Sequence, residues 1–183
     1  HAAAANWGRV NGLGTLHGST IGCLGLGEIG REVASRGTAF GAEVLYYQRS
    51  ELPDEITAPL GARYCGFEEL LERSDYVSIH LPMNDTTRGM MDADAFARMK
   101  NGAFLVNISR AAIIDRGALM DVLESDRLGG VALDVHYEEP SPRNEPLKNY
   151  PKALLTPHTA VAGRQNATAD MEDLIGNLAS AIR

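Results

Sequence analysis

The sequence predicts an α/β fold, a doubly wound parallel sheet of the Rossmann-like type with helices on both faces. Short apolar segments alternate along the chain with segments of helical periodicity, which is typical of parallel strands joined by helices. No internal repeat interrupts this order. At 183 residues the chain is long enough for one domain with a hydrophobic core and hardly for two. We therefore expect residues 1–183 to form a single domain.

Local patterns predict the individual elements. Apolar runs bounded by turn residues indicate six strands, at 21–24, 43–47, 75–79, 103–106, 131–133 and 153–155. The first helix follows Gly30, carries Val33, Ala34 and Phe40, and ends at Gly41. Apolar spacing and aspartates suited to capping indicate further helices at 67–73, from Asp92 to Met99, from Asp115 to a stop at Gly129, and at 171–182.

Other stretches are expected to be irregular. Pro53 and Pro59 should break regular structure in the connection 50–61, and residues 139–151 are rich in proline and polar side chains. Before the first strand, residues 2–7 resemble the end of a helix and residues 8–18 a polar approach. The chain begins with His1 and four alanines, which is typical neither of a natural start nor of a signal peptide.

Composition excludes several classes of function. Hydrophobic residues make up 44% of the chain and charged residues 22%, as in ordinary globular proteins. A net charge of −7 argues against a nucleic-acid partner, and no apolar run approaches the length of a membrane span. The two cysteines, Cys23 and Cys65, are expected to be buried thiols in a reducing, cytoplasmic compartment. No metal site is expected.

The most informative motif follows the first predicted strand. Gly25, Gly27 and Gly30 stand at the G-x-G-x-x-G spacing, where a strand ends and a helix begins. In a dinucleotide-binding turn the first glycine permits a tight turn, the second leaves room for a pyrophosphate, and the third lets the helix lie close to the strand. The N–H groups of Glu28 and Ile29 would then face the phosphates. The strand–turn–helix–strand context predicts a dinucleotide site.

The end of the second strand bears on which dinucleotide binds. NAD sites usually place Asp or Glu about 20 residues after the glycines, where the carboxylate accepts hydrogen bonds from the ribose. Here Gln48 stands near that position, followed by Arg49 and Ser50. A carboxylate would repel a 2′-phosphate, whereas these side chains are neutral or donate hydrogen bonds. We expect NADP, with NAD as the alternative if Arg49 is only a solvated charge.

Candidate catalytic residues follow the later strands. Ligands of open α/β sheets bind at the carboxyl ends of the strands, where Arg110, Glu139 and His158 are expected. His158 can exchange a proton because the ordinary pKa of imidazole is about 6.5, and Glu139 would orient the ring if the two side chains meet. Arg110 can bind the carboxylate of a 2-oxo acid. Each residue alone also has a structural explanation, but their combination predicts hydride transfer.

Four segments in this order resemble the signatures of the D-isomer-specific 2-hydroxyacid dehydrogenase family, at 25–31, 106–110, 133–140 and 156–158. The resemblance covers essentially the whole chain. It implies the cofactor domain of a two-domain enzyme, a homodimer formed through this domain, and a small 2-oxo acid substrate, as in glyoxylate and hydroxypyruvate reductases. NADP-using members commonly carry a neutral residue followed by Arg and Ser or Thr, as at 48–50.

The resemblance also implies roles for single residues. Arg110 would bind substrate, Glu139 would pair with His158, and His158 would be the acid/base. Leu81 and Pro82 would flank the adenine, Thr87 and Ile108 would touch the cofactor, and Asp134 would hold the nicotinamide carboxamide. The full expected cofactor set is Gly25, Gly27, Glu28, Ile29, Gly30, Gln48, Arg49, Ser50, Leu81, Pro82, Thr87, Ile108, Arg110, Asp134, His158 and Ala160.

Three features leave alternatives open. Ala111 and Ala112 stand where the family often has glycine, which would shift the substrate pocket slightly. Corepressors that sense dinucleotides also resemble this family and retain its Arg, Glu and His, so an interaction protein is the alternative from another class. Phosphite dehydrogenases are similar relatives as well, whereas formate dehydrogenases typically have Gln where Glu139 stands.

Overall fold

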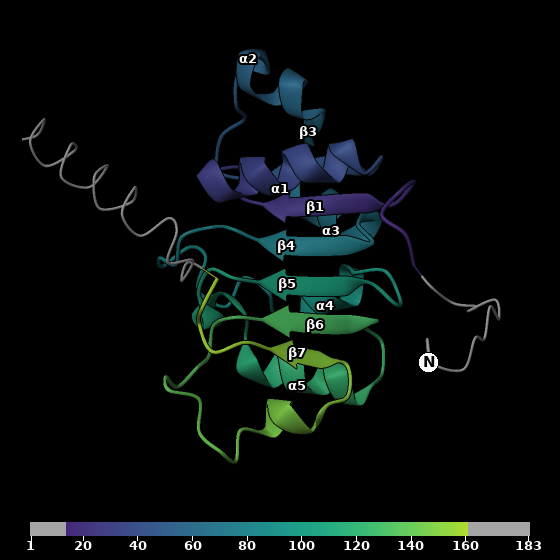
Figure 1. The fold of residues 1–183 in the computed structure, drawn as a ribbon. Helices are drawn as coiled ribbons and strands as arrows, with labels where there is room; N and C mark the ends of the chain where they lie inside the picture. Colours follow the sequence, from purple (N-terminus) through teal and green to yellow (C-terminus); the bar gives the residue numbers. More distant parts are fainter. Residues whose placement is uncertain (1–13, 161–183) are drawn as a thin grey trace, which may run out of the picture.

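The computed structural model describes residues 14–160, which build a seven-stranded sheet in the order β3-β2-β1-β4-β5-β6-β7 (Figure 1). All neighbouring strands are parallel. The chain first moves from β1 out to β3 and then returns to β4 on the other side of β1, so the predicted doubly wound topology is confirmed. The strands are β1 Thr20–Leu24, β2 Glu43–Tyr47, β3 Ala62–Tyr64, β4 Tyr76–Ile79, β5 Phe104–Asn107, β6 Gly130–Leu133 and β7 Ala153–Leu155.

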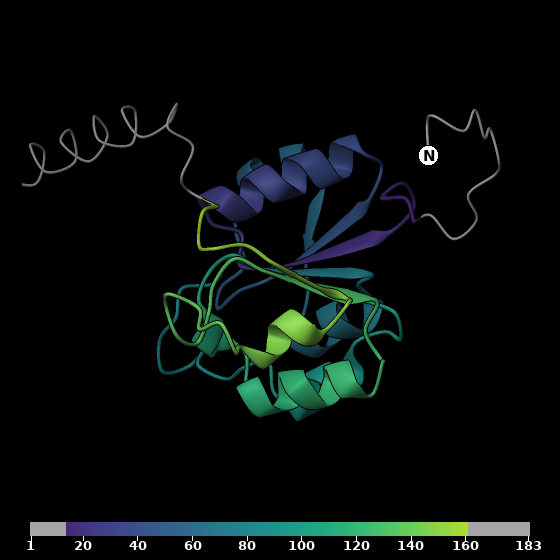
Figure 2. The same cartoon turned by 60° about the horizontal axis from the view of Figure 1, so that its bottom comes forward.

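Helices lie on both sides of this sheet (Figure 2). α1 packs on β1 and β2 from one side, and α3 packs on the same two strands from the other, where α4 and α5 follow it. The four helices are α1 Glu28–Ala39, α3 Phe67–Arg73, α4 Ala93–Arg98 and α5 Arg116–Glu124. Short helical turns lie between them, at α2 Asp54–Thr57, η2 Ala58–Leu60, η3 Ala111–Ile113 and η4 Pro146–Asn149.

Two hydrophobic clusters arise from the alternation of side chains along each strand. Leu24 and Leu45 point into the larger cluster under α3, α4 and α5, whereas Cys23 and Val44 point into the smaller one under α1. The expectation of buried thiols is confirmed, since Cys23 and Cys65 are both buried and free. Burial raises the pKa of the Cys23 thiol to about 12, which keeps it protonated and unreactive.

Coverage of the sheet is uneven. On the α1 face Phe104 of β5 stacks on Tyr76 of β4, with ring centroids 5.3 Å apart, but remains 41% exposed. Leu154 on the edge strand β7 is 65% exposed. Within residues 14–160, helices therefore cover both faces beside β1 and β2, while β5 and β7 leave part of the α1 face open.

The connection between β2 and α3 differs from the prediction. It contains two helical turns within residues 50–61, where an irregular segment was expected, and then a strand, β3, that was not predicted. Pro53 precedes the first turn of α2 and Pro59 lies in the first turn of η2, positions at which the missing N–H of proline has no helical partner to lose. β3 was missed because its three residues are too few to show a strand pattern.

Helix limits agree in part with the sequence. Asp92 and Asp115 cap α4 and α5 as predicted, through hydrogen bonds from the backbone N–H groups of Ala95 and Ala118. α5 ends at Glu124, five residues before Gly129, because the chain turns at Asp126 with a positive φ of 57°. The expected loop 139–151 contains the turn η4, which Glu145 caps. α1 ends at Ala39, so Phe40, expected within the helix, follows it and is 65% exposed.

Two predictions lie outside the described residues, the helix end at 2–7 and the terminal helix at 171–182. No helix between residues 14 and 160 is long and apolar enough to cross a membrane.

Candidate functional site

The turn between β1 and α1 gives each glycine different surroundings. Gly25 has a φ of +99°, and a Cβ there would lie 3.0 Å from the backbone of His80. A Cβ on Gly30 would lie 2.3 Å from the carbonyl oxygen of Gly25, so the helix approaches the turn too closely for a side chain. A Cβ on Gly27 would meet nothing within 4 Å among residues 14–160, so that part of the chain leaves open space at the exposed N-terminus of α1. This geometry fits a pyrophosphate on the turn.

A cavity of about 560 Å³ opens beside this turn, at the ends of β2 and β4. It gathers six residues that the sequence places at the cofactor, Gln48, Arg49, Ser50, Leu81, Pro82 and Thr87. Four further residues complete its lining, Tyr47, Asn84, Thr86 and Met90. Apolar side chains and hydrogen-bond donors meet in one hollow, a combination suited to a nucleoside.

Hydrogen bonds fix two of these side chains. The amide oxygen of Gln48 accepts from the backbone N–H of Leu26 at 3.1 Å, and its amide nitrogen donates to the carbonyl oxygen of Ser50 at 2.9 Å. Gln48 therefore ties the glycine turn to the end of β2. The hydroxyl of Thr87, which is buried, donates to the carbonyl oxygen of Pro82 at 2.7 Å and shapes the loop after β4.

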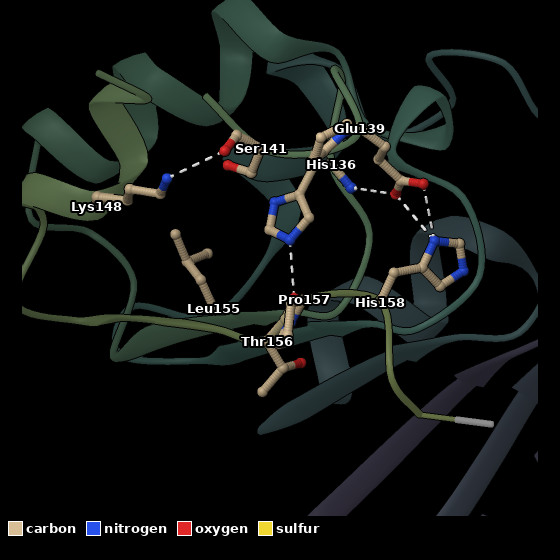
Figure 3. Close-up of a pocket in the computed structure, with 9 residues that line it drawn as sticks. His136, Glu139, Ser141, Lys148, Leu155, Thr156, Pro157 and His158 are labelled. Carbon is tan, nitrogen blue, oxygen red and sulfur yellow. Dashed lines mark hydrogen bonds and ion pairs between the residues drawn. The ribbon is translucent and has the colours of Figure 1, made fainter. Parts of the chain in front are cut away.

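The second part of the site lies at the ends of β6 and β7 (Figure 3). The Nδ1 atom of His158 lies 3.0 and 2.9 Å from the two carboxylate oxygens of Glu139. A carboxylate only accepts hydrogen bonds, so Nδ1 carries the proton and Nε2 is the nitrogen left to exchange one. The backbone N–H of His136 and then the His158 ring lower the pKa of Glu139 below its ordinary value.

Asp134 organises the turn that carries His158. Its buried carboxylate accepts from the hydroxyl of Thr156 and from the backbone N–H groups of Thr159 and Ala160, at 2.9 and 2.8 Å. Burial acts to raise the pKa of Asp134, but these three hydrogen bonds outweigh it and hold the pKa below its ordinary value. Three acceptor positions are occupied, which leaves about one for a further donor.

Arg110 lies at the same edge of the sheet but apart from the pair. It follows β5, whose last residue Asn107 is in register with Leu133 at the end of β6. Its guanidinium is exposed and donates to the carbonyl oxygen of Ser109 at 2.7 Å. Within residues 14–160 no hydrogen bond or ion pair joins Arg110 to Glu139 or His158. Ile108, half-buried, precedes it on the same turn.

Sequence reasoning missed His136. This residue lines a cavity of about 420 Å³ behind the Glu139–His158 pair, together with Pro140, Ser141, Lys148, Leu155, Thr156 and Pro157. Its ring Nε2 lies 2.8 Å from the carbonyl oxygen of Thr156 (Figure 3). A second histidine three residues before Glu139 was the available signal.

The fold and site together define a dinucleotide-binding domain with an imidazole–carboxylate pair at the carboxyl edge of its sheet. The family described as "D-isomer specific 2-hydroxyacid dehydrogenase, NAD binding domain" matches residues 2–160. The chain belongs to this family, as the sequence motifs indicated, and its cofactor is a nicotinamide dinucleotide.

Known relatives agree with this assignment. Glyoxylate reductase of Aeropyrum pernix is 45% identical over 150 residues, which cover 82% of this chain and 44% of that protein. Human D-3-phosphoglycerate dehydrogenase is 38% identical over 160 residues, 87% of this chain and 30% of that protein. The crystal structure of a glyoxylate reductase from Paecilomyes thermophila aligns with a TM-score of 0.86 at 39% identity, over 100% of this chain and 55% of that one. The chain thus spans about half the length of these relatives or less.

Proposed function

We propose that the protein carrying this chain reduces a small 2-oxo acid, of the glyoxylate or hydroxypyruvate kind, with NADPH. The Glu139–His158 pair carries this proposal, because it sets a proton donor at the same sheet edge as an open glycine turn. Residues 14–160 would act as the cofactor domain. The relatives named glyoxylate reductase support the choice of substrate class.

His158 would supply the proton for the reaction. Glu139 holds the proton on Nδ1, so Nε2 of the charged ring can donate to the carbonyl oxygen of the substrate as that oxygen gains negative charge. Before the transfer, the ionised carboxylate stabilises the positive charge of the imidazole ring. After the transfer the ring is neutral, and it takes up a new proton from solvent. In the reverse direction Nε2 would accept the proton of the hydroxyl group.

Arg110 would bind the carboxylate of the substrate. Among residues 14–160 only one of its nitrogens makes a hydrogen bond, to the carbonyl oxygen of Ser109, which leaves donors of the guanidinium for two parallel hydrogen bonds. The bound dinucleotide supplies the hydride. With three hydrogen bonds accepted within residues 14–160, Asp134 has about one acceptor position for an amide N–H, which supports its expected role at the carboxamide.

Arg49 and Ser50 would give the preference for NADP. Both are exposed on the cavity beside the glycine turn, and the Gln48 amide between that turn and Ser50 adds no negative charge. A guanidinium there can pair with a 2′-phosphate, whereas a carboxylate would repel it. A homodimer and a cytoplasmic location are the further expectations, and sedimentation of the full-length protein tests the first.

The reaction is tested on the full-length protein with glyoxylate and hydroxypyruvate. Arg110→Ala should lower kcat/KM by roughly 10- to 100-fold, because a charge-assisted pair contributes about 1.5–3 kcal/mol. Arg98→Ala is the matched control, since Arg98 pairs with Glu72 on the exposed surface of α4. Equal turnover by the Arg110 and Arg98 variants would show that Arg110 does not bind the substrate. Absence of turnover by the wild type would favour the corepressor-like alternative.

Cofactor preference is tested by fluorescence titration with NADPH and NADH. We expect the wild type to bind NADPH more tightly, and Arg49→Ala to lose roughly 10- to 100-fold in affinity for NADPH alone. Arg36→Ala, at the far end of α1, should change neither affinity because Arg36 pairs with Glu32. Tighter binding of NADH by the wild type would refute the role of Arg49.

A further inference from the structure

Hydrogen bonds around the Glu139–His158 pair form a closed cycle. One carboxylate oxygen of Glu139 accepts from the backbone N–H of His136 at 3.0 Å and from Nδ1 of His158 at 3.0 Å. The carbonyl oxygen of Thr156 accepts from the backbone N–H of His158 at 3.0 Å and lies 2.8 Å from Nε2 of His136. The two histidines are thus joined twice, once through the carboxylate and once through the carbonyl (Figure 3).

The His136 ring is the link between the two loops that carry the pair. His136 and Glu139 belong to the loop after β6, whereas Thr156 and His158 belong to the loop after β7. The Thr156 carbonyl has no proton to give, so Nε2 of His136 must be the donor. Thr156 is itself fixed, since its backbone N–H donates to Leu133 at 3.0 Å and its hydroxyl donates to Asp134.

The backbone conformation of His158 requires contacts such as this link to hold it. His158 has a φ of +55°, in the left-handed region that residues other than glycine seldom occupy, and such a conformation costs roughly 1–3 kcal/mol. It persists only where surrounding contacts hold it. Both side chains, His158 and Glu139, are about 40% exposed, so packing covers them only in part and hydrogen bonds contribute to the restraint.

We propose that His136 is a positioning residue, whose ring donates to Thr156 and so holds Glu139 in line with His158. The inference rests on the proposed function of that pair. The backbone N–H of residue 136 reaches Glu139 whatever the side chain, but the ring fixes that backbone against the end of β7. Loss of the donor would let the loop carrying Glu139 move relative to His158, and misplacement of about 1 Å lowers rates by as much as roughly 100-fold.

Three substitutions separate the donor from the shape of the ring. His136→Phe keeps the ring and removes the donor. His136→Gln places an amide N–H the same number of bonds from Cα as Nε2 of the histidine. His136→Asn carries the same amide one bond too short to reach Thr156. A packing role predicts that Phe is tolerated and Gln is not, which is the opposite of the role proposed here.

The variants are compared in the full-length protein. We expect Phe and Asn to lower kcat with a 2-oxo acid by roughly 10- to 100-fold while the Kd for NADPH stays unchanged, and Gln to restore most of kcat. Wild-type turnover by the Phe variant, or a Gln variant as slow as Phe, would overturn the role of His136.

A second readout does not depend on activity. In proton–nitrogen correlation spectra the Nδ1 signal of His158 reports its hydrogen bond to Glu139. We expect this signal to move in the Phe and Asn variants and to stay in place in the Gln variant, and an unmoved signal in all three would overturn the proposal. If the wild type reduces no 2-oxo acid, the proposed function fails while this comparison still decides the role of His136.

Discussion

Glycines in one turn can serve folding or ligand binding, and two glycines of the turn after β1 allow these two roles to be measured separately. Gly30→Ala would place a methyl group 2.3 Å from a carbonyl oxygen of the backbone, so we expect a loss of roughly 1–3 kcal/mol in the free energy of unfolding. Gly27→Ala meets nothing within 4 Å and precedes the helix, so it should cost less than about 1 kcal/mol.

Of the same two variants, Gly27→Ala should lose more affinity for the dinucleotide, although Gly30→Ala loses more stability. A methyl group at residue 27 would occupy the open space before α1, and we expect the affinity for NADPH to fall while urea unfolding is nearly unchanged. Unaltered NADPH affinity in Gly27→Ala would mean that the pyrophosphate does not approach the turn at this point. The stability of Gly30→Ala measured by urea unfolding is the companion test.

Asp134 leads to a prediction about pH. Its pKa is lowered in the folded protein, so its contribution to stability is present above the ordinary carboxyl range and is lost as pH falls through the folded value. Asp134→Asn turns an amide toward backbone donors and should cost roughly 2 kcal/mol at pH 7. We expect this difference in the free energy of unfolding to persist at pH 5 and to shrink below about pH 4. Urea unfolding of both proteins at each pH measures it. A constant difference down to pH 2 would contradict it.

Single residues also show why the site was only partly predictable. Glu139 and His158 could be found because their chemistry is paired and both follow strands. His136 offers only the weaker signal of a second histidine near Glu139, since its proposed role depends on a carbonyl oxygen twenty residues later that only the fold brings near. Gln48 was read as a neutral neighbour of a phosphate, whereas its amide links two backbone segments.

At the scale of elements, the helix caps offer a direct test. Asp92 and Asp115 each accept one backbone N–H, from Ala95 at 2.9 Å and from Ala118 at 2.8 Å. Substitution of either aspartate by alanine should lower the free energy of unfolding by about 1 kcal/mol, because a donor in the first turn loses its partner. Substitution by asparagine should cost much less, since asparagine caps as well. Equal losses from Ala and Asn, measured by urea unfolding, would show that the charge matters instead.

Elements with strong local patterns were predicted, and those decided by context were not. The short apolar runs of β1 and β2, whose consecutive residues are buried, are visible in the sequence, as are the two caps. β3 has only three residues, and it forms because β2 offers an unpaired edge. Prolines were taken as breaks, yet Pro53 and Pro59 begin helical turns, where proline is tolerated.

For the whole molecule, the strand order explains why distant motifs meet. β1 lies between β2 and β4, so the glycine turn stands between Arg49, which follows β2, and the strands that lead on to His158. Each strand is parallel to the next, and all carboxyl ends therefore share one edge. An extended ligand along this edge would reach from the end of β2 toward the end of β6.

The exposure of the Glu139–His158 pair predicts how the chain behaves by itself. Glu139 and His158 are each about 40% exposed, and Arg110 is exposed at the same edge, so water reaches the groups that would handle the substrate. Electrostatic contacts weaken in water, and catalysis of this kind needs a closed, oriented site. We expect residues 1–183 alone to bind NADPH nearly as tightly as the full-length protein.

Turnover, unlike NADPH binding, should differ between residues 1–183 alone and the full-length protein. If closure of a second surface orients and shields the substrate in the full-length protein, kcat/KM with glyoxylate should fall by at least about 100-fold in the isolated chain. The comparison requires that circular dichroism shows the chain folded and that fluorescence shows NADPH bound. Equal turnover by the isolated chain and the full-length protein would mean that residues 1–183 hold the complete site and that Arg110, Glu139 and His158 act without closure.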